Sequence, residues 1–159
     1  MPEITLSLPT AVASHALGHH LAALVTAGDV LTLSGPMGAG KTTLAQGLIA
    51  GLTGQTDASS PTYTLVHRYG HANGPIWHFD LYRLNHPEEA LEAGLEDALS
   101  GGTDDGGLVL IEWPERAGDL IPEDSIAITL SAPTDTPRHV HINAPAHWID
   151  SLKTWTAPA

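Results

Sequence analysis

The sequence predicts an α/β domain in three layers, with a mixed central sheet flanked by helices. Short apolar or alternating runs typical of strands recur along the chain between segments in which leucine and alanine have helical spacing. A glycine-rich turn at 35–40 joins one such strand to a helix. The run Leu-Val-Leu-Ile at 108–111 is apolar on both faces, as in a parallel strand buried at the centre of a sheet.

The first third of the chain predicts two strand-helix pairs. Apolar and polar residues alternate over 4–8, as in an edge strand, and apolar residues then recur at helical spacing between Thr10 and about Ala27. Residues 30–34 form a short apolar run that predicts a second strand. The leucine and alanine content of 41–51 predicts the second helix, so the glycine-rich turn lies between a strand and a helix.

The middle of the chain predicts a hairpin followed by a helix. Residues 65–69 and 76–79 have the pattern of strands, and Asn73-Gly74 between them is a typical hairpin turn. Helical spacing of apolar residues predicts one helix over 88–99, and the acidic, glycine-rich segment 101–107 predicts a flexible loop.

The last third predicts the central strand, two further strands and a final helix. After 108–111, apolar residues alternate over 126–130 and 140–142, and a short helix is expected within 146–155. The chain has no internal repeat and no linker, and its length is usual for one domain. Residues 1–159 are therefore expected to form a single domain.

Composition favours a globular protein whose partners are proteins. Hydrophobic residues make up 42% of the chain and charged residues 15%, unlike a disordered sequence. Acidic side chains outnumber basic ones by 18 to 6, so the net charge of −12 would repel a nucleic acid. Autonomous binding of tRNA or DNA is therefore not expected, and any tRNA would be reached only indirectly, through a protein complex.

The sequence also predicts a cytoplasmic protein without a membrane partner. It contains no cysteine, which excludes disulfides, thiolate zinc sites and a cysteine nucleophile but does not by itself fix the compartment. Its longest apolar runs are far shorter than the ~18 residues that cross a bilayer. The N-terminal residues lack the basic and apolar segments of a secretory signal.

Residues 35–42, Gly-Pro-Met-Gly-Ala-Gly-Lys-Thr, have the pattern of a phosphate-binding loop, or P-loop. The glycines let backbone N–H groups approach phosphate oxygens, and the helix that follows turns its positive end toward the anion. Lys41 is expected to reach the β- and γ-phosphates, and Thr42 to offer its hydroxyl to Mg²⁺. An accidental glycine loop is the alternative, but this pattern is rare by chance, so the expected fold is a P-loop NTPase domain that binds a nucleoside triphosphate with Mg²⁺.

Two acidic residues end predicted strands and are candidates for the same site. Glu112 follows the buried run 108–111, and Asp80 follows 76–79. The carboxyl ends of parallel strands meet at one edge of a sheet, where ligands bind in open α/β folds. One acid would ligate or orient Mg²⁺ and the other would position the attacking water, although either is also compatible with a solvated strand end. The sequence leaves the assignment of the two roles open.

Two more residues are candidates near the nucleotide. Thr62, within Ser59-Ser60-Pro61-Thr62-Tyr63, lies in a loop of switch-like composition, and its hydroxyl is a candidate sensor of the γ-phosphate or Mg²⁺. The alternative is an ordinary Ser-Pro turn. Trp113 directly follows Glu112 and is expected beside the nucleotide or a partner surface, with core packing as the alternative.

Four segments are distinctive when they are taken together, and they are Gly-Ala-Gly-Lys-Thr-Thr at 38–43, Ser-Pro-Thr-Tyr-Thr-Leu-Val at 60–66, His-Phe-Asp-Leu-Tyr-Arg-Leu at 78–84 and Ile-Glu-Trp-Pro-Glu at 111–115. The first is shared by many ATPases and kinases. The other three, in this order and at these spacings, resemble the bacterial TsaE family, also called YjeE. The resemblance extends over nearly the whole chain.

The resemblance implies an ATPase that uses ATP and Mg²⁺ and works with TsaB and TsaD to form threonylcarbamoyladenosine in tRNAs that read codons beginning with A. In that family TsaD transfers the threonylcarbamoyl group, and the ATPase sustains turnover. The implied Mg²⁺ ligands are Thr42 and Glu112. The expected catalytic residues are Asp80, Glu112, Lys41 and the switch-like Thr62. The expected nucleotide contacts are Met37, Gly38, Ala39, Gly40, Lys41, Thr42, Thr43, Asp80 and the late basic residue Arg138.

Other functions share the P-loop. A small-molecule kinase generally gathers several cations around the transferred phosphoryl group, and the whole chain has six basic residues. A nucleotide-gated binding module would bind the same ligand without turnover. A GTPase is not expected, because neither Lys41 nor Lys153 belongs to an Asn-Lys-x-Asp segment.

Overall fold

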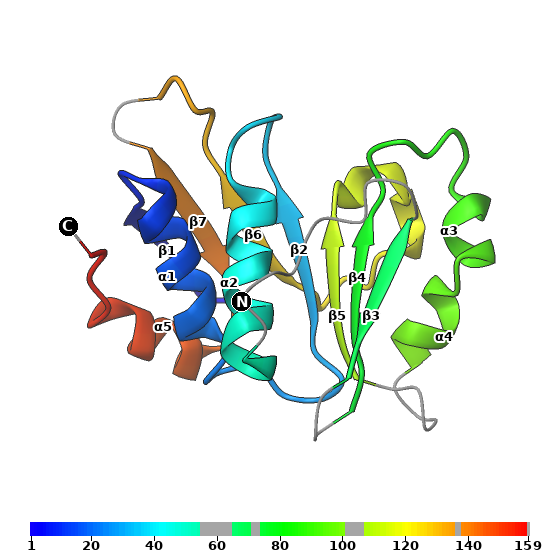
Figure 1. The fold of residues 1–159 in the computed structure, drawn as a ribbon, viewed down its shortest axis with the longest axis horizontal. Helices are drawn as coiled ribbons and strands as arrows, with labels where there is room; N and C mark the ends of the chain where they lie inside the picture. The colour runs from blue at the N-terminus through cyan, green and yellow to red at the C-terminus, as the bar shows by residue number, and fades with distance from the viewer. Residues whose placement is uncertain (55–64, 71–73, 101–106, 136–137, 159) are drawn as a thin grey trace.

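The computed structural model describes residues 1–54, 65–70, 74–100, 107–135 and 138–158. The strands are β1 (Glu3–Ser7), β2 (Val30–Ser34), β3 (Val66–Tyr69), β4 (Ile76–Asp80), β5 (Leu108–Glu112), β6 (Ile126–Leu130) and β7 (His139–Asn143). In the described residues they form one sheet of seven strands in the order β1-β7-β6-β2-β5-β4-β3 (Figure 1). The predicted strands are confirmed, with small differences at their ends.

The sheet is parallel at its centre and antiparallel toward both edges. β6, β2, β5 and β4 run parallel to one another. β3 pairs antiparallel with β4, β7 with β6, and β1 with β7. Tyr69 lies opposite Ile76, so residues 70–75 connect the hairpin, and Asn73 of the predicted turn lies outside the described residues. The mixed sheet expected from the sequence is confirmed.

The helices are α1 (Ala11–Leu21), α2 (Lys41–Thr53), α3 (Glu88–Glu92), α4 (Leu95–Ser100) and α5 (Ala146–Lys153), with 3₁₀ turns at Pro114–Arg116 and Gly118–Leu120. Thr10 caps α1, since its hydroxyl accepts a hydrogen bond from the backbone N–H of Ala13. Within the described ranges, the length and hydropathy that a membrane-spanning helix needs do not occur together in any helix.

Alternate residues of β5 pack into two different cores, one on each face of the sheet. Leu108 and Leu110 share a core with α1, α2 and α5, whereas Val109 and Ile111 share a second core with α3 and α4. Every residue of β5 is buried. The strand is therefore covered from both sides, which explains its continuous apolar run and confirms the three-layered α/β class.

The first helix is shorter than its apolar spacing predicts. α1 ends at Leu21, whereas the sequence pattern extends to Ala27. The carboxylate of Asp29 accepts hydrogen bonds from the backbone N–H of Thr26 at 2.8 Å and from its hydroxyl at 3.2 Å, which stabilises a turn in place of the last helical turns. Val25 still packs against the core. The segment therefore has apolar residues at helical spacing because they are buried, although it does not form a helix.

The single helix predicted over 88–99 is wrong, because two short helices take its place. Gly94 has a φ of 97°, which lies outside the right-handed helical region, and it separates α3 from α4. Ala90 and Ala98 are both buried in the second core. The apolar spacing thus reflects burial of two consecutive helices on one face of the sheet.

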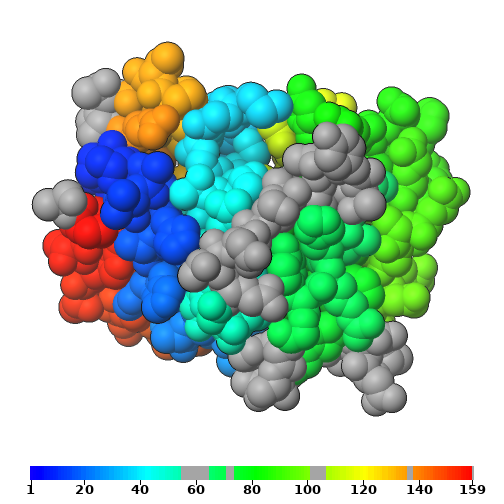
Figure 2. Space-filling model, in the orientation of Figure 1, coloured from blue at the N-terminus to red at the C-terminus, as the bar shows by residue number. Residues whose placement is uncertain are grey.

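The helices α1 and α2 pack directly against each other, and their segments lie side by side at the surface in Figure 2. A Cβ on Gly18 would lie 2.1 Å from the carbonyl oxygen of Leu44, and a Cβ on Gly47 would lie 2.1 Å from that of His15. Because interiors are close-packed, only glycine fits at these two positions. Since α2 begins at the P-loop, this contact also fixes the helix that presents the loop.

We predict that Gly47→Ala destabilises the protein by about 2 kcal/mol, because the backbone of α1 must move to admit the new methyl group. Gly70→Ala is the matched control, since a Cβ on Gly70 would meet no atom within 4 Å. Its effect should stay within about 0.5 kcal/mol. Urea denaturation of both variants checks this, and equal unfolding midpoints would contradict the required close contact.

Candidate functional site

The P-loop joins β2 to α2 at the carboxyl edge of the parallel strands. Gly35 has a φ of 143°, and a Cβ there would lie 2.7 Å from the carbonyl oxygen of Leu130. Gly40 has a φ of 104° and precedes α2 without a side-chain cap. The first turn of α2 therefore presents its backbone N–H groups and its positive end to an anion.

Lys41 is the cation at the centre of this loop. Its side chain is 5% exposed, and its Nζ donates hydrogen bonds to the carbonyl oxygens of Gly35 at 2.5 Å and Pro36 at 2.9 Å. The Nζ also lies 4.1 Å from the ring centroid of Trp113. Burial lowers the pKa of Lys41 below its ordinary value, and the negative charges of Glu112, Glu115 and Asp80 oppose that shift.

Glu112 ends β5 as a buried carboxylate that connects three elements. Its side chain is 2% exposed. Its Oε1 accepts a hydrogen bond of 3.0 Å from the hydroxyl of Thr42 on α2. Its Oε2 lies 2.6 Å from Nε2 of His78 on β4. The side chain is thus held from both sides within reach of the P-loop.

Asp80 ends β4 directly beside Glu112 in the parallel register. It is half-buried, and its Oδ1 accepts a hydrogen bond of 3.1 Å from the backbone N–H of Tyr82. The two acids that the sequence places at strand ends therefore lie at one edge of the sheet, and Glu112 is next to the end of β2. Lys41, Thr42, Asp80 and Glu112 are brought together there.

Aromatic side chains border the site on the side of Trp113. Trp113 has a φ of 59°, the left-handed conformation that non-glycine residues seldom adopt. The backbone adopts this conformation directly after Glu112, and the indole ring lies over the ammonium group of Lys41. The ring of Tyr82 lies 4.9 Å from that of Trp113, and the guanidinium of Arg116 lies 5.7 Å from the ring of Tyr82.

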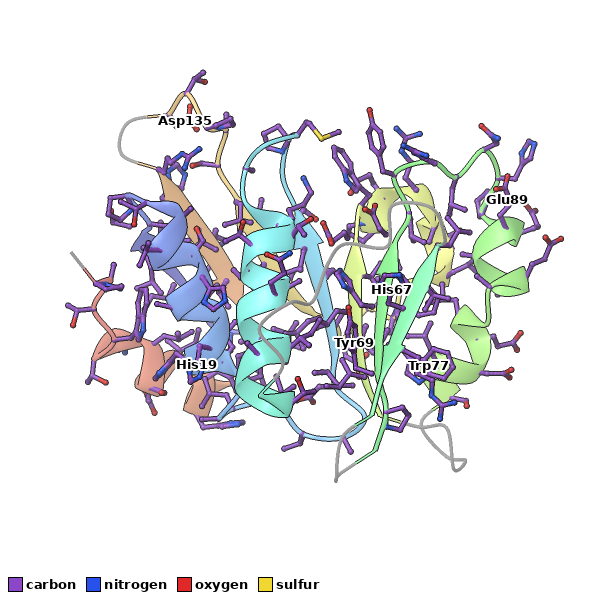
Figure 3. The ribbon with its side chains drawn as sticks, viewed as in Figure 1. His19, His67, Tyr69, Trp77, Glu89 and Asp135 are labelled. Carbon is purple, nitrogen blue, oxygen red and sulfur yellow. The ribbon has the colours of Figure 1, made fainter. Side chains whose placement is uncertain are left out.

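The other predicted contacts have different positions. Met37 is exposed on the loop, and Thr43 is half-buried in the first turn of α2. Arg138 lies where the β6–β7 loop enters β7, with its Nε 3.4 Å from the carbonyl oxygen of Pro133. A Cβ on Gly38 would lie 3.7 Å from Cγ of Pro133, so this loop borders the P-loop. Figure 3 shows Asp135 of the same loop projecting at this edge of the sheet. Thr62 lies outside the described residues.

The donors at the site fit a magnesium ion that is bound together with a nucleotide. A hydroxyl and a carboxylate are the hard oxygen ligands that Mg²⁺ prefers, and phosphates and water usually complete its coordination. In the part of the chain that the structure describes, no three or more His, Asp and Glu side chains form a metal-binding group. Thr42 and Glu112 therefore fit a shared metal-nucleotide site better than a metal cage made by protein alone.

His78, Tyr82 and Arg116 belong to the site although the sequence assigns them no role. His78 is fully buried, and it is two residues before Asp80 on the same face of β4. The period of two along a strand places it on the same face as Asp80, but its contact with Glu112 depends on the pairing of β4 with β5, which the sequence alone does not show. Tyr82 and Arg116 are in irregular segments, where no such period exists.

Comparison with known proteins identifies what the chain is similar to. The family model described as threonylcarbamoyl adenosine biosynthesis protein TsaE matches residues 8–140. A relative from Haemophilus influenzae, named tRNA threonylcarbamoyladenosine biosynthesis protein TsaE, is 45% identical over 98 residues, which are 62% of this chain and 60% of the relative. A protein of the same name from Nostoc is 47% identical over 100 residues, 63% of this chain and 61% of the relative. The matched part thus spans about three fifths of these two relatives.

Two further comparisons cover more of the chain. The protein of the same name from Bacillus subtilis is 33% identical over 123 residues, which are 77% of this chain and 74% of the relative. The crystal structure of Bacillus subtilis YdiB superposes with a TM-score of 0.74 and 25% identity, covering 96% of this chain and 93% of that one. The α/β fold therefore has a counterpart among solved structures.

We predict that the burial of Lys41 makes its contribution to the free energy of unfolding increase with pH. Burial lowers the pKa of Lys41 in the folded protein below 10.5, which is its value in the unfolded chain. At a pH between these two pKa values, the unfolded chain therefore binds more protons than the folded protein does. The free energy of unfolding, measured relative to that of Lys41→Met, should therefore rise as the pH increases from neutral toward 10.5. Urea denaturation at several pH values measures this, with exposed Lys153→Met as the control. A difference that falls with pH would contradict the effect of burial.

Proposed function

This chain belongs to the TsaE family, and from that premise we propose that it is an ATPase that acts in the biosynthesis of tRNA threonylcarbamoyladenosine. The observation that carries the proposal is the convergence of Lys41, Thr42 and Glu112 at the carboxyl ends of β2 and β5. A P-loop with a buried lysine and a hydroxyl-carboxylate pair is suited to a nucleoside triphosphate with Mg²⁺.

In the proposed site each side chain has a separate task. Lys41 exchanges its bonds to the loop carbonyls for β- and γ-phosphate oxygens, and the N-terminus of α2 stabilises the same negative charge. Thr42 and Glu112 would hold Mg²⁺, which neutralises charge that develops during phosphoryl transfer. Arg138 and the loop from Met37 to Thr43 would complete the nucleotide contacts.

The burial of the two acids favours an assignment that the sequence leaves open. Glu112 is almost fully buried, and each of its oxygens has a hydrogen-bonding partner, which suits a rigid orienting role near the metal. Asp80 is half-buried at the next strand end, which suits contact with an attacking water molecule. We therefore assign Glu112 to Mg²⁺ and Asp80 to the positioning of water.

The proposal makes TsaB and TsaD the partners and keeps tRNA at a distance from this chain. Its net charge of −12 disfavours direct contact with a polyanion. Transfer of the threonylcarbamoyl group then takes place on the partner proteins, and ATP hydrolysis here sustains repeated cycles. The proposed process places the chain in the cytoplasm, where tRNAs are modified.

We predict that repeated rounds of threonylcarbamoyladenosine formation require the P-loop lysine. Purified TsaB and TsaD, tRNA, threonylcarbamoyl-adenylate and ATP with Mg²⁺ would be combined with no addition, this protein, Lys41→Ala or Lys153→Ala. Turnover should continue only with the unaltered protein and with Lys153→Ala, whose substitution removes the other lysine of the chain. Identical product curves in all four samples, with active partners, would reject the proposed role. Sustained turnover without ATP hydrolysis would favour a nucleotide-gated binding module.

We predict that replacing each of the two carboxylates by an amide affects a different property of the protein. Asp80→Asn should lower the rate of ATP hydrolysis by at least about tenfold and leave nucleotide affinity within about threefold. Glu112→Gln should weaken nucleotide binding in Mg²⁺ but not in EDTA. Calorimetric titration with ADP and a steady-state ATPase assay measure both quantities, and the reverse pattern would exchange the two roles.

A further inference from the structure

We propose that His78 is a positioning residue that holds the carboxylate of Glu112 in the orientation needed by the metal-bound nucleotide. The inference rests on the proposed function, because it concerns the same Mg²⁺ and ATP. It assigns a task to a buried side chain that lies too deep in the sheet to be one of the phosphate contacts.

The register of the sheet places His78 diagonally next to Glu112, one step below it on the neighbouring strand. Asp80 pairs with Glu112 and His78 with Leu110, so the imidazole lies one step below the strand ends, on the face that α2 covers. Its side chain is fully buried. The distance of 2.6 Å from Nε2 to Oε2 of Glu112 is that of a short, charge-assisted hydrogen bond.

Hydrogen bonding also indicates how the proton is arranged. An ionised carboxylate only accepts, so the Nε2 of His78 carries the proton and donates it to Glu112. The Nδ1 of His78 has no hydrogen-bonding partner among the described residues. An unpartnered lone pair on Nδ1 is less costly in the core than a second, unpartnered N–H, so the neutral Nε2–H tautomer fits this surrounding.

Two donors on different elements fix the plane of the carboxylate. Thr42 on α2 binds one oxygen and His78 on β4 binds the other. The hydroxyl of Thr42 is also the group expected to contact Mg²⁺, so its bond to Glu112 must adapt when the metal binds. His78 touches no part of the P-loop in the described contacts and keeps the second oxygen in place through that change. Outer partners of this kind typically affect metal affinity by about 10–100-fold.

The test compares nucleotide affinity with and without metal. ADP affinity is measured by calorimetry in Mg²⁺ and in EDTA, and the ratio of the two dissociation constants is the metal enhancement. His78→Leu removes the donor at similar volume, and His78→Gln places an amide N–H near the position of Nε2. His67→Leu makes the same chemical change directly opposite on β3, and Ile76→Val perturbs the same face of β4. Figure 3 labels His67 on its strand.

The proposal expects His78→Leu to reduce the metal enhancement by about tenfold or more, with the affinity in EDTA within about twofold. His78→Gln should restore most of the enhancement, and the two controls should retain it. An unchanged enhancement in a folded His78→Leu variant would overturn the proposal, as would an equal loss in Ile76→Val. No metal enhancement in the unaltered protein would instead overturn the proposed function, and this inference with it.

A second measurement decides the matter if His78→Leu does not fold. Nitrogen-15 NMR of the unaltered protein identifies which ring nitrogen of His78 carries the proton. The expected result is a slowly exchanging proton on Nε2 whose resonance shifts when ADP with Mg²⁺ is added and not when ADP is added in EDTA. A proton on Nδ1, or a resonance insensitive to the metal, would overturn the positioning role.

Discussion

A carboxylate buried at the end of a central strand needs hydrogen-bond donors, and in this chain that requirement joins the parts of the site. Glu112 accepts from Thr42 at the start of α2 and from His78 within β4, so the helix that follows the P-loop and two adjacent strands meet at one side chain. Leaving such a group unpaired in the core would be costly. The position of the P-loop relative to Asp80 is therefore defined by the same bonds that stabilise the buried charge.

The rest of the fold keeps this arrangement rigid. The glycine contact between α1 and α2 sets the axis of the helix that carries Lys41 and Thr42. The parallel pairing of β2, β5 and β4 places the three strand ends at one edge, where the acids face the loop. The indole of Trp113 then covers Lys41 and keeps its ammonium group weakly hydrated. A phosphate that displaces the loop carbonyls thus meets a positive charge that is already desolvated and in place.

Most of the strands were predictable from the sequence, because each is buried on at least one face. A strand buried on one face alternates apolar and polar residues, and a strand buried on both faces has a continuous apolar run. The P-loop and the strand ends at Asp80 and Glu112 were also predictable from the sequence. The end of α1 and the break at Gly94 were not, since buried turns keep the apolar spacing of a helix. His78 was missed for a different reason. A lone histidine among apolar residues acquires a role only through its neighbour on the next strand, and strand order is a property of tertiary structure.

The central claim is that this buried carboxylate and the P-loop form one metal-nucleotide site. Replacing Mg²⁺ by paramagnetic Mn²⁺ and recording NMR spectra with and without ADP tests it most directly. The account predicts that resonances of Thr42, Glu112 and His78 broaden most strongly, and only when both Mn²⁺ and ADP are present, while those of Ala27 and Leu108 at the opposite edge of the sheet broaden much less. Broadening that does not require ADP, or that centres on the acidic residues Glu88 and Glu89 of α3 and Glu96 and Asp97 of α4, would contradict it.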